Sequence, residues 1–320
     1  MALCDRLEQE QTDSLEAHRT LVETLLRTLT DAPDAEAAQQ AWTRIAQHFD
    51  TLFTTEHSID QLKQTILQLA VMGKLVPQNP EDEPASVLLE KIAKEKARLV
   101  KEGRIKKPKK LPENGEKEMP FELPEGWAWT TLSYLGVFSG GKTPSKNRPE
   151  YWNGNIPWVT PKDMGGDEIL DSIDHVTIKS TEDGLALYEP DSLLFVVRSG
   201  ILRRKFPVAV AKIKCTVNQD LKVLSPYFPQ TSSYIRLMMK GFEPYILENL
   251  TKSGMTVESI IFDKFATHSF PIPPLAEQHR IVAKVDELIA LCDTLKARIR
   301  EAQTTELRLA DAVVARAVAG

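Results

Sequence analysis

The sequence predicts an α+β protein in which a mixed α/β domain lies between helical regions. Apolar residues recur at helical spacing near both ends of the 320-residue chain, whereas short β-like runs separated by turn residues fill its middle. We therefore expect an N-terminal helical region over residues 1–110, a mixed domain over 111–273 that includes an entry linker, and a long C-terminal helix over 274–320. A hydrophobic content of 42% is enough for ordinary cores.

Composition excludes several classes of protein. No apolar run approaches the roughly 18 residues of a membrane span, and the first residues are too polar for a signal peptide. We expect a cytoplasmic protein with no membrane partner. The three cysteines, Cys4, Cys215 and Cys292, are too few and too scattered for a disulfide framework or a zinc site.

The sequence of the N-terminal region predicts three helices. One covers residues 1–30, and a second begins with a capping box from Ser58 to Gln61 and ends at Gly73. The third helix runs from residue 85 to Gly103. The following segment, 104–127, contains four prolines without a period, which is typical of an extended linker.

The middle of the chain alternates strand-like runs with turns. We expect strands in "WAWTTLSYLGVF" (127–138), "IPWVT" (156–160), "DHVTIKS" (174–180), "SLLFVV" (192–197) and "PVAVAKIKCTV" (207–217). A single helix over 232–250 interrupts them, and prolines at 271, 273 and 274 end the β region.

The C-terminal helix carries a heptad seam. Its apolar residues follow one another in alternating steps of four and three, which is the spacing of a coiled coil. The seam consists of Ile281, Val285, Leu288, Cys292, Leu295 and Ile299. We expect it to pack against N-terminal helices of the same chain or of a second one.

A short internal repeat links the two ends. "MALCDRL" (1–7) matches "IALCDTL" (289–295) at five positions, including one of the cysteines in each segment. The chain therefore resembles one unit of a cyclic pattern of helix, globular domain and helix, and two copies placed head to tail would continue it.

The stretch from Gly136 to Thr143 has the spacing of a phosphate-binding loop, but its context is wrong. Such a loop needs a helix that starts at the Lys-Thr pair, whereas Pro144 follows Thr143 directly. The nearest candidate for a magnesium-binding strand, 192–197, ends in Arg198 and not in Asp. A P-loop nucleotide-binding protein remains an alternative interpretation, as does a coiled-coil scaffold with a peptide-binding head.

No catalytic set is present in the sequence. The six histidines lack metal-ligand spacing, no glycine-rich cofactor motif opens a helix, and no Asp-Pro-Pro-Tyr-like stretch offers an adenine-binding site. We therefore predict a binding protein with no catalytic residues and no cofactor or metal site of its own.

The distribution of charge favours an anionic partner despite a net charge of −5. From Arg198 to Lys222 there are seven basic residues and only one acidic residue, Asp220. A second basic run, 96–110, is interpreted as a solvated face or linker.

The chain resembles the specificity subunits of type I restriction-modification systems. The resemblance rests on "PLAEQHRIVAKVDELIALCDTL" (274–295), supported by "SIDQLKQTILQLAVMGKLVPQ" (58–78), "LPEGWAWTTLSYLG" (123–136), "YWNGNIPWVTPKDM" (151–164) and "SGMTVESI" (253–260). It implies a target recognition domain over 111–273 that grips double-stranded DNA, flanked by the family's conserved coiled-coil-forming helices. The resemblance implies that these helices dock methyltransferase subunits.

The resemblance also implies the partners and cofactors. The subunit directs adenine methyltransferase and restriction subunits to a bipartite DNA target, and adenosylmethionine, ATP and Mg belong to those subunits. Family members usually carry two recognition domains, whereas this sequence has one. It therefore resembles a half-subunit, for which a homodimer would restore the full pattern.

Loop residues of the middle domain supply the predicted DNA contacts. Arg and Lys suit guanine or phosphate, and Gln suits adenine. The predicted contacts are Lys142, Ser145, Lys146, Lys162, Arg198, Ser199, Arg203, Arg204, Lys205, Gln219 and Lys252. Gly140 and Gly141 are expected to let the backbone approach a phosphate. For Trp129, Trp152 and Trp158, packing in the core is favoured over stacking on bases.

Overall fold

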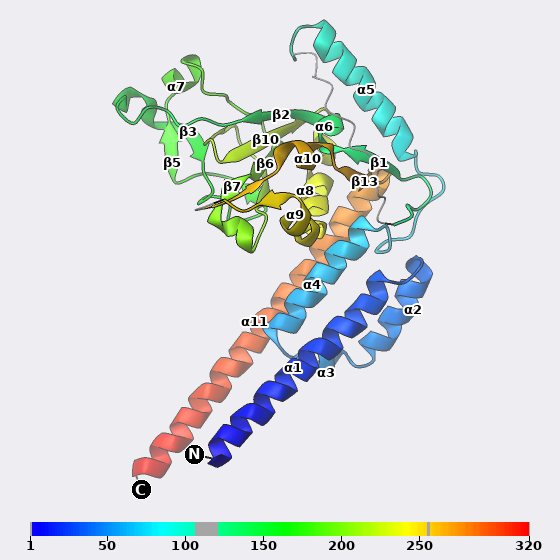
Figure 1. The fold of residues 1–320 in the computed structure, drawn as a ribbon, viewed down its shortest axis with the longest axis vertical. Coiled ribbons are helices and arrows are strands. Elements are labelled where there is room, and N and C mark those ends of the chain that lie inside the picture. Colours follow the sequence, from blue (N-terminus) through cyan, green and yellow to red (C-terminus); the bar gives the residue numbers. More distant parts are fainter. Residues whose placement is uncertain (1, 106–120, 255–256, 320) are drawn as a thin grey trace. The chain divides into compact units, whose positions relative to one another are not determined.

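The computed structural model describes residues 2–105, 121–254 and 257–319, so that most of the predicted linker lies outside the described residues. The chain forms two compact units (Figure 1). Unit 1 comprises Met1–Pro77 and Ala283–Gly320, and unit 2 comprises Gln78–Val282. None of the helices in the described part of the chain is both long and apolar enough to span a bilayer.

Unit 1 is a bundle of helices. It contains α1 (Ala2–Thr30), α2 (Ala35–Ala46), α3 (Phe49–Leu52), α4 (Glu56–Val71) and the part of α11 (Leu275–Ala319) that follows Val282. On α1, Val22, Leu26 and Leu29 recur at helical spacing and are buried. On α4, Ile59, Leu62, Ile66 and Leu69 form the corresponding buried stripe.

Helix α11 runs antiparallel to α4, as a ladder of ion pairs shows. Arg300 donates to Glu56 at 2.6 Å and Lys296 to Asp60 at 2.6 Å, and Lys63 pairs with Asp293. Residue numbers along α11 therefore decrease as those along α4 increase. These pairs are partly exposed, so they contribute to register more than to stability.

Helix α4 begins one turn earlier than predicted. The N-cap is Thr55, whose hydroxyl accepts from the Ser58 amide at 3.1 Å, while the Ser58 hydroxyl accepts from the Thr55 amide at 3.2 Å. The capping box from Ser58 to Gln61 was therefore wrong, because Thr55 already supplies the side-chain oxygen. The predicted stop is confirmed: Gly73 has φ 71°, and the Lys74 amide donates to the Leu69 carbonyl at 2.9 Å.

Helix α2 was not predicted from the sequence. Asp34 caps it by accepting from the Ala37 amide at 2.8 Å, and Ala38, Ala41 and Ile45 form its short buried face. The capping aspartate and the helical spacing of these three residues were the available signals.

Unit 2 is built around four small sheets (Figure 1). Their orders are β1-β13, β2-β10-β6-β8-β4, β11-β12-β7 and β5-β3-β9. The strands are β1 (Ala128–Thr131), β2 (Gly136–Gly140), β3 (Trp152–Val159), β4 (Glu168–Ile169), β5 (Asp174–Val176), β6 (Leu193–Val196), β7 (Arg198–Ser199), β8 (Val208–Ala211), β9 (Thr216–Val217), β10 (Leu221–Pro226), β11 (Thr251–Lys252), β12 (Glu258–Ile260) and β13 (Ser269–Ile272).

Helical segments cover and connect these sheets. They are α5 (Ala85–Lys101), α6 (Leu132–Leu135), α7 (Ile178–Glu182), α8 (Ser232–Gly241), α9 (Glu243–Asn249), α10 (Phe262–Thr267) and the 3₁₀ segments η1 (Pro149–Tyr151), η2 (Gly200–Arg203) and η3 (Pro229–Thr231). The predicted single helix over 232–250 was wrong, because Pro244 lies in the first turn of α9 and cannot continue α8.

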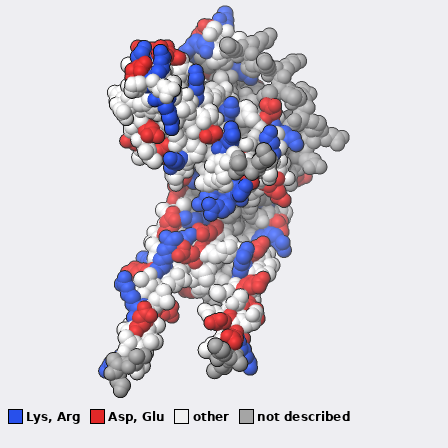
Figure 2. All heavy atoms as spheres, turned by 60° about the vertical axis from the view of Figure 1, so that its left-hand side comes forward, with Lys and Arg blue, Asp and Glu red and all other residues white. Residues whose placement is uncertain are grey.

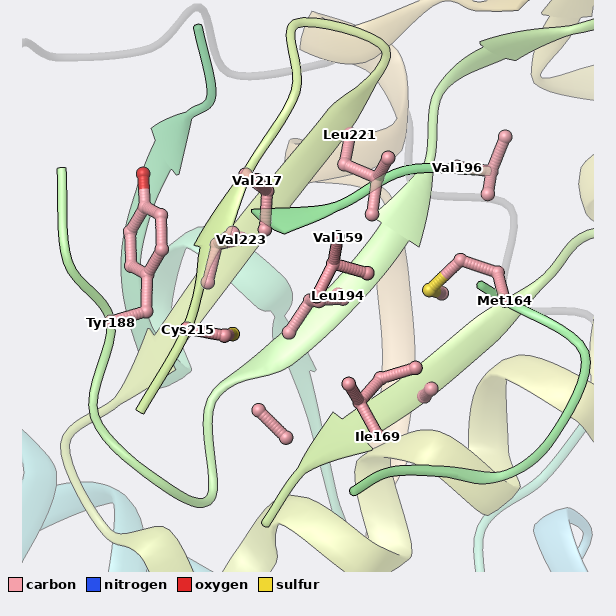
Figure 3. Packing of buried hydrophobic residues seen from close by; sticks show 12 residues of the cluster. Val159, Met164, Ile169, Tyr188, Leu194, Val196, Cys215, Val217, Leu221 and Val223 are labelled. Atoms are coloured by element: carbon pink, nitrogen blue, oxygen red, sulfur yellow. The ribbon is translucent and has the colours of Figure 1, made fainter. Parts of the chain in front are cut away.

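The largest sheet is buried on both faces at β6. Leu194 and Val196 belong to an apolar cluster with Val159, Met164 and Val217 (Figure 3). The intervening Phe195 lies 5.7 Å from Phe265 between ring centroids, within an aromatic group on the opposite face. All four residues of β6 are buried, which explains the continuous apolar run in the sequence.

The structure groups α5 with unit 2, whereas the sequence analysis grouped it with the N-terminal helices. Leu88 and Ile92 of α5 are buried, the Ala85 amide donates to the Gly126 carbonyl at 2.8 Å, and the Tyr134 hydroxyl donates to the Leu89 carbonyl at 3.2 Å. These contacts explain why the division falls at Pro77 and not near residue 110.

The predicted seam of α11 lies inward in the same chain. Ile281, Val285 and Cys292 are buried, and Leu288, Leu295 and Ile299 are half-buried. Leu288, Cys292 and Leu295 share the wall of a cavity of about 580 Å³ with residues of α1 and α4. Beyond residue 300, every described side chain of α11 is exposed.

Truncating the core of unit 1 tests this packing. Ile59 is 0% exposed, so Ile59→Ala should lower the free energy of unfolding by about 2–5 kcal/mol. Ile178→Ala is the matched control, because Ile178 is 59% exposed and its truncation should change stability by less than about 0.5 kcal/mol. Denaturant unfolding of both variants measures the difference, and equal losses would contradict the described core.

Candidate nucleic-acid interface

The end of a short parallel strand pair gathers the first group of predicted contacts. β3 pairs with β9 through Trp158 with Thr216 and Val159 with Val217, and the Asn218 amide extends the pair by donating to the Val159 carbonyl at 2.9 Å. Because the strands are parallel, the chain leaves both at the same edge. Lys162 follows β3 and Gln219 follows β9, and both side chains are exposed.

The loop from Gly141 to Arg148 is fixed to the same strand pair. The Lys142 amide donates to the Val217 carbonyl at 3.0 Å, and the Lys142 carbonyl accepts from the Trp158 indole at 3.2 Å. The Trp152 indole donates to the Ser145 carbonyl at 3.2 Å, and the Thr143 hydroxyl donates to Gln219. The side chains of Lys142, Ser145 and Lys146 are exposed on this fixed loop.

This geometry does not support a P-loop. No helix follows Lys142 and Thr143; within the described stretch 141–148 the backbone is a turn and extended chain. A Cβ on Gly141 would lie 2.0 Å from the Asn218 carbonyl oxygen and 2.1 Å from that of Val217. The close approach that Gly141 permits is therefore to the protein's own backbone, which corrects the expectation that this glycine makes room for a phosphate.

Arg198 lies beside this edge. The Val197 amide donates to the Asp220 carbonyl at 2.9 Å, so β7 begins next to the turn that carries Gln219. In the small sheet, Ser259 of β12 is directly opposite Arg198 of β7 on one side and Lys252 of β11 on the other. Directly paired residues project from the same face, which places Arg198, Ser259 and Lys252 in one row. We call these three residues the cationic row.

Ser199 and Arg203 lie on the other side of that sheet. Ser199 is paired with Glu258, the neighbour of Ser259, and successive residues of a strand project from opposite faces. Arg203 donates to Glu258 at 2.9 Å, and the Ser199 hydroxyl accepts from the Ile201 amide at 3.3 Å as the cap of η2. The predicted contacts in "RSGILRR" are thus divided between two faces.

Arg204 and Lys205 follow η2 and are exposed. The next residue, Phe206, is buried, and its amide donates to Glu243 at 2.8 Å. Burial raises the pKa of the Glu243 carboxyl. This anchor fixes the end of the basic segment to α9.

The predicted cations differ from their neighbours in ion pairing. In the parts of unit 2 that the structure describes, no ion pair is formed by Lys142, Lys146, Lys162, Arg198, Arg204, Lys205 or Lys252. By contrast, Lys214 pairs with Glu189 at 3.0 Å and Lys179 with Asp183 at 3.4 Å. Figure 2 shows one face on which basic side chains of unit 2 lie both singly and beside acidic ones.

Sequence reasoning missed two neighbours of these cations. Ser259, at the centre of the cationic row, was not selected because a serine in a two-residue pairing has no distinctive pattern. Lys222 is paired with Gly140 in the β10–β2 ladder, and its Nζ lies 5.1 Å from the Phe262 ring centroid. Its position in the basic stretch 198–222 was the available signal.

The tryptophans serve packing, as the sequence analysis favoured. Trp158 is 7% exposed, and its ring meets that of Trp152 edge to face at 5.1 Å. Trp129 packs on Phe121 at 5.3 Å. As for metal sites, no group of three or more His, Cys, Asp or Glu side chains is suitably placed among the described residues.

Substitution of Gly141 tests the role assigned to it. Gly141→Ala should lower the free energy of unfolding by about 1–3 kcal/mol or more, because backbone atoms of Val217 and Asn218 must move. Gly165→Ala is the control, since a Cβ there meets nothing within 4 Å. Thermal melts of both variants decide the matter, and an unchanged melt for Gly141→Ala would contradict the close approach.

A family model and several known proteins match this chain. The model of the type I restriction modification DNA specificity domain matches residues 124–303. The chain is 41% identical to the EcoAI specificity subunit of Escherichia coli over 99% of its length, and 40% identical to the EcoEI specificity subunit of the same species over 98%. Each alignment covers 54% of the relative, so the chain spans about half the length of these relatives.

A solved structure shares the fold. A chain from a study of complex assembly and conformational transition in a type I R-M system aligns with 72% of this chain and 56% of that one, at a TM-score of 0.50 and 21% identity. This similarity supports the α+β assignment.

Proposed function

Since the chain belongs to the family of type I restriction-modification specificity subunits, we propose that it recognises a DNA sequence on behalf of a methyltransferase assembly. The observation that carries the proposal is the set of unpaired cations in unit 2. Lys142, Lys162 and Arg198 lie on segments joined by backbone hydrogen bonds at one edge of the β3–β9 pair, and Lys252 lies two strands from Arg198 in the adjoining sheet. Uncompensated cations on fixed loops are suited to contact phosphates and base edges.

In this proposal, other subunits catalyse methylation and restriction. The chain itself is a non-catalytic component; methyltransferase subunits bind adenosylmethionine, and restriction subunits bind ATP and Mg. The chain contributes the choice of DNA sequence, and it acts in the cytoplasm.

A map of adenine methylation at base resolution tests this function. Cells that express the chain together with the methyltransferase subunit of its system should methylate adenines in a specific sequence motif. Cells that express the methyltransferase without the chain should not methylate that motif. The Lys142→Ala and Lys214→Ala variants refine the test, because both remove one positive charge but Lys214 is already paired with Glu189. Methylation should fall for Lys142→Ala and persist for Lys214→Ala, whereas no new motif with the intact chain would contradict the function.

We further propose that two copies of the chain act together through α11. The same spacing beyond Ile299 passes through Ala302 and the polar Glu306 before it reaches Leu309 and Val313, which are 62% and 68% exposed in the single chain. The repeat of "ALCD" between α1 and α11 supports a second copy as the partner that covers this seam. A palindromic methylation motif is expected from two identical recognition domains.

The mass of the purified protein tests the pairing. Light scattering should give the mass of two chains for the intact protein, and the mass of one chain for Leu309→Lys combined with Val313→Lys. Leu307→Lys is the control, because Leu307 is 68% exposed but lies off the seam. If the intact protein has the mass of one chain, the homodimer is contradicted. The exposed seam of α11 would then have to pair with a helix of a different protein.

A further inference from the structure

The cationic row has the geometry of a site for a single anionic group. Arg198, Ser259 and Lys252 are adjacent across three strands that are about 4.7–4.9 Å apart, so the two cations flank the serine at a total separation of about 10 Å. Both cations are exposed, and Ser259 is half-buried. An anion over Ser259 is therefore within reach of both long side chains.

The row presents hydrogen-bond donors without a competing acceptor. In the described part of the chain, Arg198 and Lys252 form no ion pair, and the Ser259 hydroxyl has no hydrogen-bond partner. Two acidic residues lie beside β7: Glu258 projects from the opposite face and pairs with Arg203, and the Asp220 carboxylate accepts from the Asn218 side-chain amide at 3.2 Å. Guanidinium, ammonium and hydroxyl groups together match the oxygens of a phosphate.

Arg203, on the opposite face of the sheet, is already ion-paired. Its guanidinium is held by Glu258, whose side chain is only 13% exposed. The pair neutralises the charge of Arg203 and fixes η2 against β12. Arg198 therefore differs from Arg203 in having a charge available to a ligand.

We propose that Arg198, Ser259 and Lys252 jointly bind one phosphodiester group of the DNA backbone, an inference that rests on the proposed function. The row positions unit 2 on the duplex and carries no sequence information itself. Base reading then falls to the adjoining edge, where Gln219 and Lys142 lie. Ser259 is the member of this site that sequence patterns did not indicate.

Binding to a short mixed-sequence duplex over a range of KCl concentrations tests the proposal. A mixed sequence suffices, because phosphate contacts dominate non-specific binding. Arg198→Ala and Lys252→Ala should each lower the slope of log affinity against log salt by about one. Ser259→Ala should weaken binding by about tenfold without changing the slope, because a neutral hydroxyl releases no counterion. Arg198→Lys should retain the slope.

Two further variants separate the row from general charge effects. Arg203→Ala and Lys214→Ala each remove one positive charge that is already paired, so their slopes should equal that of the intact protein. The double variant Arg198→Ala with Lys252→Ala should lose affinity by a smaller factor than the product of the factors for the two single variants, since both cations act on one group.

The outcomes distinguish this inference from the proposed function. Unchanged slopes for Arg198→Ala and Lys252→Ala, with duplex binding and the methylation motif intact, would overturn the phosphate site alone. The phosphate site would also be overturned if Arg203→Ala lowered the salt slope as much as Arg198→Ala does. Absence of duplex binding by the intact protein, with or without methyltransferase, would overturn both.

Discussion

The parallel contact between β3 and β9 determines where the candidate interface lies. Through it and the Asn218–Val159 hydrogen bond, the segments that carry Lys162 and Gln219 leave the sheet at a common edge. The loop with Lys142 is then fixed to this edge by its own amide and by two tryptophan indoles. Gly141 permits the arrangement, because any side chain at that position would overlap the backbone of Val217 and Asn218.

The core of unit 2 supplies the rigidity that this edge requires. Val159 and Val217, the last residues of the parallel pair, belong to the same buried cluster as Leu194 and Val196. The strand that leads to Arg198 is therefore packed against the strands that lead to Lys162 and Gln219. A binding surface on short strands gains its precision from such shared packing. In unit 1, partly exposed ion pairs between α4 and α11 fix the register of the two helices.

Ion pairing divides the basic residues into two groups with different roles. Lys179, Arg203 and Lys214 neutralise nearby carboxylates and stabilise local structure, whereas Lys142, Arg198 and Lys252 form no ion pair with any residue that the structure describes. This difference resolves the apparent conflict between a net charge of −5 and an anionic partner. Two acidic residues, Asp163 and Asp220, lie at the edge formed by β3 and β9, where their carboxylates accept from the Thr160 amide at 2.8 Å and from the Asn218 side-chain amide at 3.2 Å.

The sequence by itself determined the α+β class and the helix stop at Gly73, and it indicated the apolar spacing along α11, because local periodicity and backbone preference govern those features. It also indicated most cations of the candidate interface, since they cluster in turn-rich segments. Only the tertiary structure decided that Gly141 serves packing, that α5 belongs to unit 2, and that Arg198 and Lys252 share a face while Arg203 does not. These features depend on strand register and on contacts between residues that are distant in the chain, such as Gly141 with Asn218 or Arg198 with Ser259, and no local pattern in the chain records such contacts.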